Sequence, residues 1–163
     1  MMDADRQILD DRARQLARPL AVALDAARTD VLFMSLGDER LAIELRYVRQ
    51  IVALPEITAV PDLPPAFLGV VNLAGAILPV VDLGVLLTER RSGQGAKRMV
   101  IVGEHRPELG LAVDDVEQIV SEDKWQPVGD APLVRGVLNG ERLLIDGDWL
   151  LRDPRLFSKI QTV

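Results

Sequence analysis

The stretch GVVNLAGAILPVVDLGVLL, residues 69–87, decides the fold of this chain. Most of its side chains are apolar, but five residues interrupt the run: Asn72, Gly75, Pro79, Asp82 and Gly84. A membrane-spanning helix needs about 18 or more apolar residues in succession, so this stretch does not predict one. Its pattern predicts two β-strands, at 67–73 and 76–83, joined by a turn near Ala74 and Gly75.

A shorter version of the same pattern returns near the C-terminus. Residues 135–151 (RGVLNGERLLIDGDWLL) parallel residues 68–87, with three residues fewer between the glycine and the aspartate that both segments contain. The preceding segments repeat at a constant spacing of 68 residues: 31–36 matches 99–104, and 41–52 matches 109–120. The chain therefore contains two copies of one pattern, and the polar loop at 90–98 is the predicted boundary between them.

Each copy contains about five short strand patterns, which predicts an all-β fold of two pseudo-symmetric five-stranded barrels. Residues 69–87 would supply the last two strands of the first barrel. Because both faces of these strands are apolar, we expect one face to fill its own barrel and the other to pack against the second barrel or a partner protein. Asp82 and Asp146 each precede a short apolar segment, and we expect each to cap a short helix.

Upstream of the repeat, residues 3–28 carry leucine, isoleucine and alanine at steps of mostly three or four. This spacing predicts a helix, with a break or kink at Pro19. We therefore divide the chain into a helical N-terminal extension, residues 1–30, and a two-barrel domain, residues 31–163. The extension is either a solvated or docked leader helix or a helix that binds a partner, and the sequence leaves both open.

The composition of the chain disfavours several classes of function. The chain has 19 basic and 25 acidic residues, a net charge of −6 and an isoelectric point near 4.8. Binding to nucleic acid or to an anionic membrane surface requires clustered basic residues, so both are disfavoured. The N-terminus, MMDADRQILDD, lacks the hydrophobic core of a signal peptide, and the chain has no cysteine. We expect a cytoplasmic protein without direct membrane insertion.

Residues that could perform chemistry are sparse. His105 is the only histidine and lies in a predicted turn. The acidic pairs at 114–115 and 122–123 could hold a cation or act as acid and base, but Arg and Tyr at 46–47 take the place of the first pair in the other copy. This difference favours solvated turns. We expect no catalytic residue, metal or cofactor, and a protein-binding function, with an enzyme or small-molecule binder as the alternative.

The order of motifs resembles a known family. An LFMSL strand is followed by GDERLAI, YVRQIV, a proline-containing loop, AFLGVVNLAGAILPVVDL, LGLAVDDVEQIV and RGVLNGERLLID. Over about residues 31–157 this is similar to the CheW-type chemotaxis coupling proteins. The resemblance implies two intertwined five-stranded, Src-homology-3-like barrels around a shared core. It also implies a non-catalytic scaffold that joins the cytoplasmic tip of chemoreceptors to the regulatory domain of a CheA-type histidine kinase.

The resemblance also implies two binding surfaces. The receptor-binding groove between the barrels would use Val48, Ile51, Asn72, Leu73, Ala74, Gly75 and Val116. The kinase-binding surface would use the strand ends around Gly69 and Val70. Family relatives pack in rings with the kinase domain, so the resemblance extends to possible self-association or ring assembly.

Two departures from the family pattern bear on this function. Ala74 stands where the family usually has an arginine that can pair with an acidic receptor residue, and the second copy has the shortened strand pair. These departures suggest a specialised coupling protein. The alternative is a stand-alone CheW-like regulator that competes at the kinase regulatory domain without conventional receptor binding. A groove covered by the helix predicted at 3–18 would instead indicate autoinhibition.

Overall fold

The computed structural model describes residues 28–91 and 95–157. The helix predicted for the N-terminal extension falls on residues outside this part of the chain. The first strand begins at Thr29, close to the predicted start of the two-barrel domain.

Both sequence copies contain the same series of five strands and a short helix. The first copy forms β1 (Thr29–Leu36), β2 (Glu39–Glu44), a 3₁₀ turn η1 (Leu45–Tyr47), β3 (Val48–Ala53), β4 (Phe67–Leu73), β5 (Ala76–Val81) and α2 (Leu83–Thr88). The second copy forms β6 (Arg98–Val102), β7 (Leu109–Val113), β8 (Asp115–Glu122), β9 (Val134–Leu138), β10 (Arg142–Ile145), α3 (Gly147–Arg152) and α4 (Pro154–Phe157). The predicted strands and the predicted repeat are confirmed.

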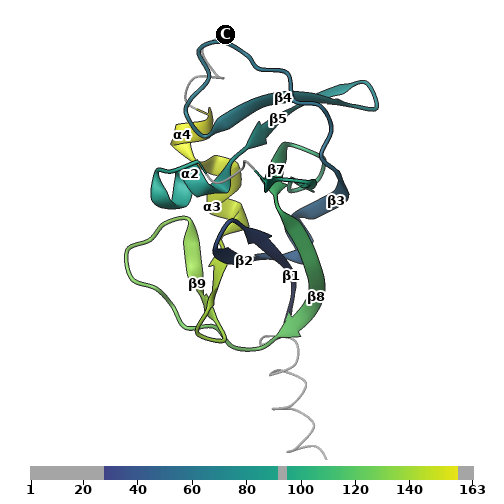
Figure 1. The fold of residues 1–163 in the computed structure, drawn as a ribbon. Coiled ribbons are helices and arrows are strands. Elements are labelled where there is room, and N and C mark those ends of the chain that lie inside the picture. The colour runs from purple at the N-terminus through teal and green to yellow at the C-terminus, as the bar shows by residue number, and fades with distance from the viewer. Residues whose placement is uncertain (1–27, 92–94, 158–163) are drawn as a thin grey trace, which may run out of the picture.

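The two copies exchange strands to build two five-stranded sheets (Figure 1). The first sheet has the order β8-β1-β2-β10-β9, and the second has the order β3-β6-β7-β5-β4. Each sheet is therefore built around the first hairpin of one copy and completed by three strands of the other. The loop at 90–98 separates the copies in sequence, but β6 beyond it belongs to the same sheet as β3, β4 and β5.

Two parallel strand pairs join the copies. β5 runs parallel to β7, with Val80 opposite Gly110, and β10 runs parallel to β2, with Leu144 opposite Ala42. The remaining exchanged pairs, β3 with β6 and β8 with β1, are antiparallel. Every pairing of one copy thus has its equivalent in the other, as a pseudo-two-fold relation requires.

The hydrophobic core follows this interlocked arrangement. A central cluster takes buried residues from both sheets and from the helices, among them Met34, Val81, Leu111 and Leu150. A smaller cluster around Val71 and Met99 fills the β3–β4 sheet, and another around Phe33 and Leu144 fills the β8–β9 sheet. On β5, Val80 belongs to the local cluster and Val81 to the central one. The two faces of this strand therefore have the two burial partners that its sequence predicts.

A short bridge covers the outer edge of the second sheet at β4. Thr58 and Val70 exchange two backbone hydrogen bonds, of 2.8 and 2.9 Å. A Cβ atom on Gly69, which has a φ of +145°, would lie 2.3 Å from the carbonyl oxygen of Thr58. This position therefore requires glycine. The second copy has the equivalent bridge, between Gln126 and Val137 at β9, beside Gly136.

The two helix caps predicted from sequence are confirmed. The Asp82 carboxylate accepts a hydrogen bond of 2.8 Å from the backbone N–H of Gly84, at the start of α2. The Asp146 carboxylate accepts one of 3.1 Å from the backbone N–H of Trp149, in α3. Both satisfy a helix N–H group that would otherwise lack a partner.

The β4–β5 turn places a non-glycine residue in the left-handed region. Ala74 has a φ of +49° and Gly75 a φ of +88°. The equivalent turn between β9 and β10 uses Asn139 and Gly140, with φ values of +53° and +73°. Asparagine tolerates this conformation better than alanine. The second copy therefore has the more favourable turn sequence.

Replacing Ala74 by asparagine should stabilise the protein. We expect Ala74→Asn to raise the free energy of unfolding by about 0.5–1 kcal/mol, because it relieves left-handed strain in the turn. Urea unfolding followed by circular dichroism would measure this change. Ala76→Asn, two residues further and inside β5, is the control and should not stabilise. An unchanged or lower stability of Ala74→Asn would contradict this account of the turn.

A buried carboxylate fastens α4 to α2. Asp153 is 1% exposed, and its carboxylate accepts hydrogen bonds from the Arg155 guanidinium, the shortest of which is 2.7 Å. Arg155 also donates to the backbone oxygen of Leu86, at the end of α2. Burial alone would raise the pKa of Asp153, but the hydrogen bonds and charge of Arg155 outweigh it, so the pKa lies below its ordinary value.

Asp153→Asn should therefore make the protein less stable at neutral pH but not in acid. The folded state favours the charged form of Asp153. The carboxylate therefore stabilises the fold above the ordinary aspartate pKa of about 4, and this stabilisation is lost as the pH falls through the lower pKa of the folded state. We expect a loss of about 1–2 kcal/mol at pH 7, allowing for the exposure of Arg155. Urea unfolding at pH 7 and pH 3 would measure it, and an equal loss at both would contradict this assignment.

Candidate protein-binding site

Two of the predicted receptor-groove residues lie at the start of edge strands. Val48 begins β3, at one edge of the second sheet, and Val116 lies on β8, at one edge of the first. Both are partly buried. They occupy equivalent positions in the two copies. At both positions the valine side chain packs against the central cluster.

The same two strands expose an isoleucine each. Ile51 on β3 is 38% exposed, and Ile119 on β8 is 56% exposed. The 68-residue spacing relates them, as it relates the neighbouring valines. Sequence reasoning named Ile51 and missed Ile119, although the spacing alone could have found it. Exposed aliphatic side chains on an edge strand are a common element of protein interfaces.

Four further predicted residues form the β4–β5 hairpin. The side-chain oxygen of Asn72 accepts a hydrogen bond of 2.9 Å from the backbone N–H of Gly75, so Asn72 holds the turn. Leu73 packs against the local cluster of the second sheet, whereas Ala74 and Gly75 are exposed at the tip. Ile77, which lies opposite Asn72, is 65% exposed and was not predicted. The hairpin thus offers an apolar side chain beside a polar turn.

The predicted kinase-binding residues lie beneath the bridge at β4. Gly69 is buried and has no space for a side chain, and the backbone N–H and C=O of Val70 are bonded to Thr58. A partner therefore cannot extend the sheet by pairing with Val70. Contact at this place would have to use side chains, including the partly buried one of Val70 and those of the covering loop.

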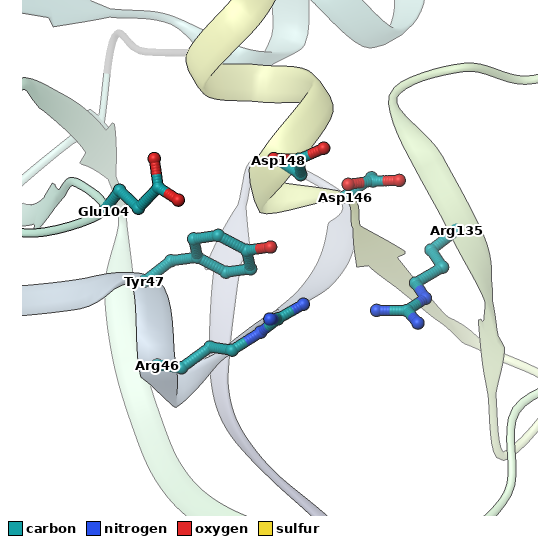
Figure 2. Close-up of a pocket in the computed structure, with 6 residues that line it drawn as sticks. All are labelled: Arg46, Tyr47, Glu104, Arg135, Asp146 and Asp148. Atoms are coloured by element: carbon teal, nitrogen blue, oxygen red, sulfur yellow. The ribbon is translucent and has the colours of Figure 1, made fainter.

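A cleft of about 560 Å³ lies beside η1 and was not predicted from the sequence. Six residues line it: Arg46, Tyr47, Glu104, Arg135, Asp146 and Asp148 (Figure 2). They come from η1, the loop after β6, β9, and α3 with its N-cap. Side chains of both copies therefore meet in this cleft, and all but the tyrosine carry a charge.

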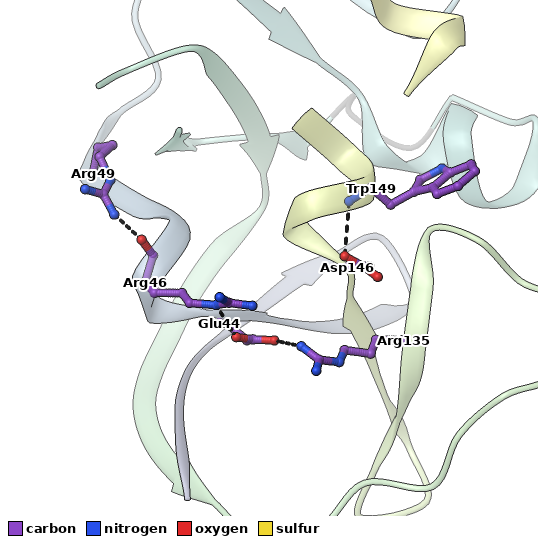
Figure 3. A network of polar contacts seen from close by, with 6 residues as sticks. All are labelled: Glu44, Arg46, Arg49, Arg135, Asp146 and Trp149. Carbon is purple, nitrogen blue, oxygen red and sulfur yellow. Dashed lines mark hydrogen bonds and ion pairs between the residues drawn. The ribbon is translucent and has the colours of Figure 1, made fainter. Parts of the chain in front are cut away.

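A buried carboxylate organises the basic side of the cleft. Glu44, at the end of β2, is 5% exposed. It forms an ion pair of 2.6 Å with Arg46 through one oxygen and a second ion pair with Arg135 through the other (Figure 3). The pKa of Arg46 is raised: burial would lower it, but the bond and charge of Glu44 outweigh that effect. The two guanidinium groups are thus held facing one another.

Tyr47 forms the floor of the cleft and connects the two sheets. The Arg46 guanidinium lies 4.6 Å from the centre of its ring, a cation–π contact. Its ring packs against Gly147 at the start of α3, where a Cβ atom would lie 2.3 Å from the ring. Its backbone oxygen accepts a hydrogen bond of 2.9 Å from Gly103, after β6. Burial raises the pKa of the hydroxyl, so Tyr47 is neutral at physiological pH.

An apolar groove of about 380 Å³ lies along the short helices. Leu86 and Leu87 of α2, the loop before β9 and Trp149 of α3 line it. Trp149 is 42% exposed, which is a large apolar area to leave in water. Sequence analysis did not predict this groove.

The acids considered for chemistry have structural partners or lie in separate places. One oxygen of Asp114 accepts a hydrogen bond of 2.8 Å from the backbone N–H of Gly37, in the β1–β2 turn. In the described part of the chain, no group of three or more histidine, cysteine, aspartate or glutamate side chains could hold a metal ion. Across those same residues, no helix is long and apolar enough to span a membrane.

Comparison with known proteins places this fold in a family. A model of the CheW-like domain matches residues 30–154. The probable chemotaxis protein CheW of Rhizobium etli is 29% identical over 149 residues, covering 86% of this chain and 94% of that protein. The chemotaxis protein CheW of Rhizobium meliloti is 31% identical over 125 residues, covering 71% of this chain and 81% of that protein.

Two further relatives broaden the comparison. Protein PilI of Pseudomonas aeruginosa is 26% identical over 163 residues, covering 94% of this chain and 89% of that protein. The crystal structure of the scaffolding protein TtCheW from Thermoanaerobacter tengcongensis has the same fold, with a TM-score of 0.65 at 24% identity over 76% of this chain and 87% of that one. The chain therefore belongs to the CheW-like domain family.

Proposed function

We propose that this protein is a non-catalytic cytoplasmic adaptor of a chemosensory pathway, which joins chemoreceptor tips to the regulatory domain of a CheA-type histidine kinase. The match of the CheW-like domain to residues 30–154 carries the proposal. Relatives from the two Rhizobium species that match most of this chain are chemotaxis proteins CheW by name. Exposed isoleucines on two equivalent edge strands support a binding role.

The receptor contact would centre on β3 and the β4–β5 hairpin. Ile51 supplies exposed apolar area, while Val48 and Val116 are anchored in the core. At the hairpin, Asn72 keeps the turn in shape, and Ala74 and Gly75 present a small, uncharged tip. Leu73 holds the hairpin to the sheet. On this proposal the receptor contacts side chains displayed by a rigid sheet, which reduces the entropy lost on binding.

The kinase contact would lie over the β4 bridge. Gly69 lets the covering loop approach β4 closely, and Val70 is fixed by the two hydrogen bonds with Thr58. Because the strand edge is already paired at this point, the kinase domain would recognise the outer surface of the loop and the side chain of Val70. Ile77, in the neighbouring strand β5, would add exposed apolar area close by.

A second function is favoured by one observation. Ala74 cannot form the charge-assisted hydrogen bond that the arginine usual in the family could form with an acidic receptor residue. Such a bond contributes about 1.5–3 kcal/mol. A chain without it could act as a regulator that occupies the kinase regulatory domain and leaves the receptor unbound. Titrating both partners distinguishes these functions.

Titration calorimetry with the kinase regulatory domain and with a receptor-tip fragment from the same genome tests the adaptor function. We expect both to bind, and Ile51→Asp to weaken receptor binding at least tenfold, because a charge would be buried in an apolar contact. Val60→Asp is the matched control, since Val60 is 40% exposed but lies outside β3. Binding to the kinase domain alone would favour the regulator, and binding to neither would refute both.

Restoring the arginine at position 74 should strengthen receptor binding. We expect Ala74→Arg to lower the Kd for the receptor-tip fragment about tenfold and to leave the Kd for the kinase domain unchanged. Ala74→Gln, which adds length without charge, should have little effect. Equal affinities of the arginine and glutamine variants would contradict a receptor contact at the hairpin tip.

A further inference from the structure

The charged cleft beside η1 exists on one side of the pseudo-two-fold only. The repeat spacing assigns each cleft residue a counterpart in the other copy. Glu44 corresponds to Ala112, Arg46 to Asp114, Arg135 to Leu68, Glu104 to Leu36 and Asp148 to Gly84. Only Asp146 has an identical counterpart, Asp82, and both cap helices. The other half of the molecule thus builds the same fold without this set of charges.

Burying a charge at this place costs folding free energy. Glu44 is 5% exposed, and removing a carboxylate from water costs several kcal/mol unless ion pairs and hydrogen bonds offset it. The counterpart Ala112 is fully buried, so the fold accepts a small apolar residue there. The fold itself therefore does not require a carboxylate at this position, which is compatible with a role of the Glu44–Arg46–Arg135 arrangement in recognition.

Among the described residues, the cleft has one excess positive charge and two acidic side chains without an ion pair, Glu104 and Asp146. Glu44 carries one negative charge and is shared by two guanidinium groups, which leaves one positive charge in excess. Asp148 is paired with Arg152 at 3.2 Å, and Asp146 accepts a hydrogen bond from α3. Glu104 forms no ion pair within residues 28–91 and 95–157. A ligand that offers a carboxylate and a cation would match the excess positive charge and the charge of Glu104.

The shape of the cleft favours a protein segment over a small molecule. The side chain of Arg46 is 63% exposed and that of Arg135 is 40% exposed. Sites for small molecules enclose most of the ligand surface, whereas a partly open cleft suits side chains that project from a larger surface. The cleft is also next to the proposed receptor surface in the chain, because Tyr47 directly precedes Val48 at the start of β3.

We propose that this cleft docks a segment of the receptor tip that presents one acidic and one basic side chain. The acidic side chain would enter between Arg46 and Arg135, so that two guanidinium groups face two carboxylates. The basic side chain would pair with Glu104. The proposal rests on the proposed adaptor function and adds to it a charged contact through residues other than those of the β4–β5 hairpin tip.

Calorimetry of the full chain with the receptor-tip fragment tests this docking. We expect Arg46→Gln and Glu104→Lys each to raise the Kd at least tenfold. Both effects should shrink as salt is raised from 50 to about 500 mM, because the lost interactions are electrostatic and partly exposed. Circular dichroism would verify that both variants fold, and the Arg46 variant keeps the ion pair between Glu44 and Arg135.

Matched controls change the same charge elsewhere. Arg40→Gln and Glu141→Lys alter a surface pair 4.0 Å apart, at the other end of β2, and should leave the Kd unchanged. If the wild-type chain and the cleft variants bind the receptor fragment equally well, the docking proposal for the cleft is wrong and the adaptor function stands. Weakened kinase binding with unchanged receptor binding would overturn the choice of partner. A wild-type chain that does not bind the receptor fragment refutes both proposals.

Discussion

The exchange of strands between the two sequence copies is the constraint on which the rest of the structure depends. Each sheet is centred on the hairpin of one copy and needs three strands of the other to complete it. The parallel pairs β5–β7 and β10–β2 can form only when both copies are in place. Neither copy has a complete sheet of its own, so the central cluster is shared and the two halves must fold together.

This interlocking also explains why the two halves can differ at their surfaces. The pairing and the core fix the backbone in both copies, so the crossover residues between the second and third strands are free to change. One crossover carries Arg46 and Tyr47 beside a buried Glu44, and the other carries two aspartates. A symmetric scaffold thereby presents asymmetric faces.

The features that depend on periodicity and local capping could be predicted from the sequence. The features formed by residues that are distant in the chain and meet only in the folded protein could not. The strands, the repeat and the caps Asp82 and Asp146 follow from local patterns. The charged cleft could not be predicted, because Glu44 and Arg135 are 91 residues apart and meet only through the intervening strand β10. The groove beside Trp149 could not be predicted either, because an isolated tryptophan gives no signal of it in the sequence.

One residue difference between the third strands of the two copies affects which of these strands pairs with β1. The third strands read VRQIV and VEQIV, so β3 and β8 differ at Arg49 and Glu117. Glu117 forms an ion pair of 2.5 Å with the buried Arg142, whose guanidinium lies 4.1 Å from the ring centre of Phe33. If β3 took the place of β8, its arginine would face the buried Arg142, and the two like charges would repel. The counterpart of Arg142 in the first copy is Leu78, which is buried against apolar neighbours and cannot impose this selection. The charged pair on the first sheet therefore favours β8 over β3 as the partner of β1.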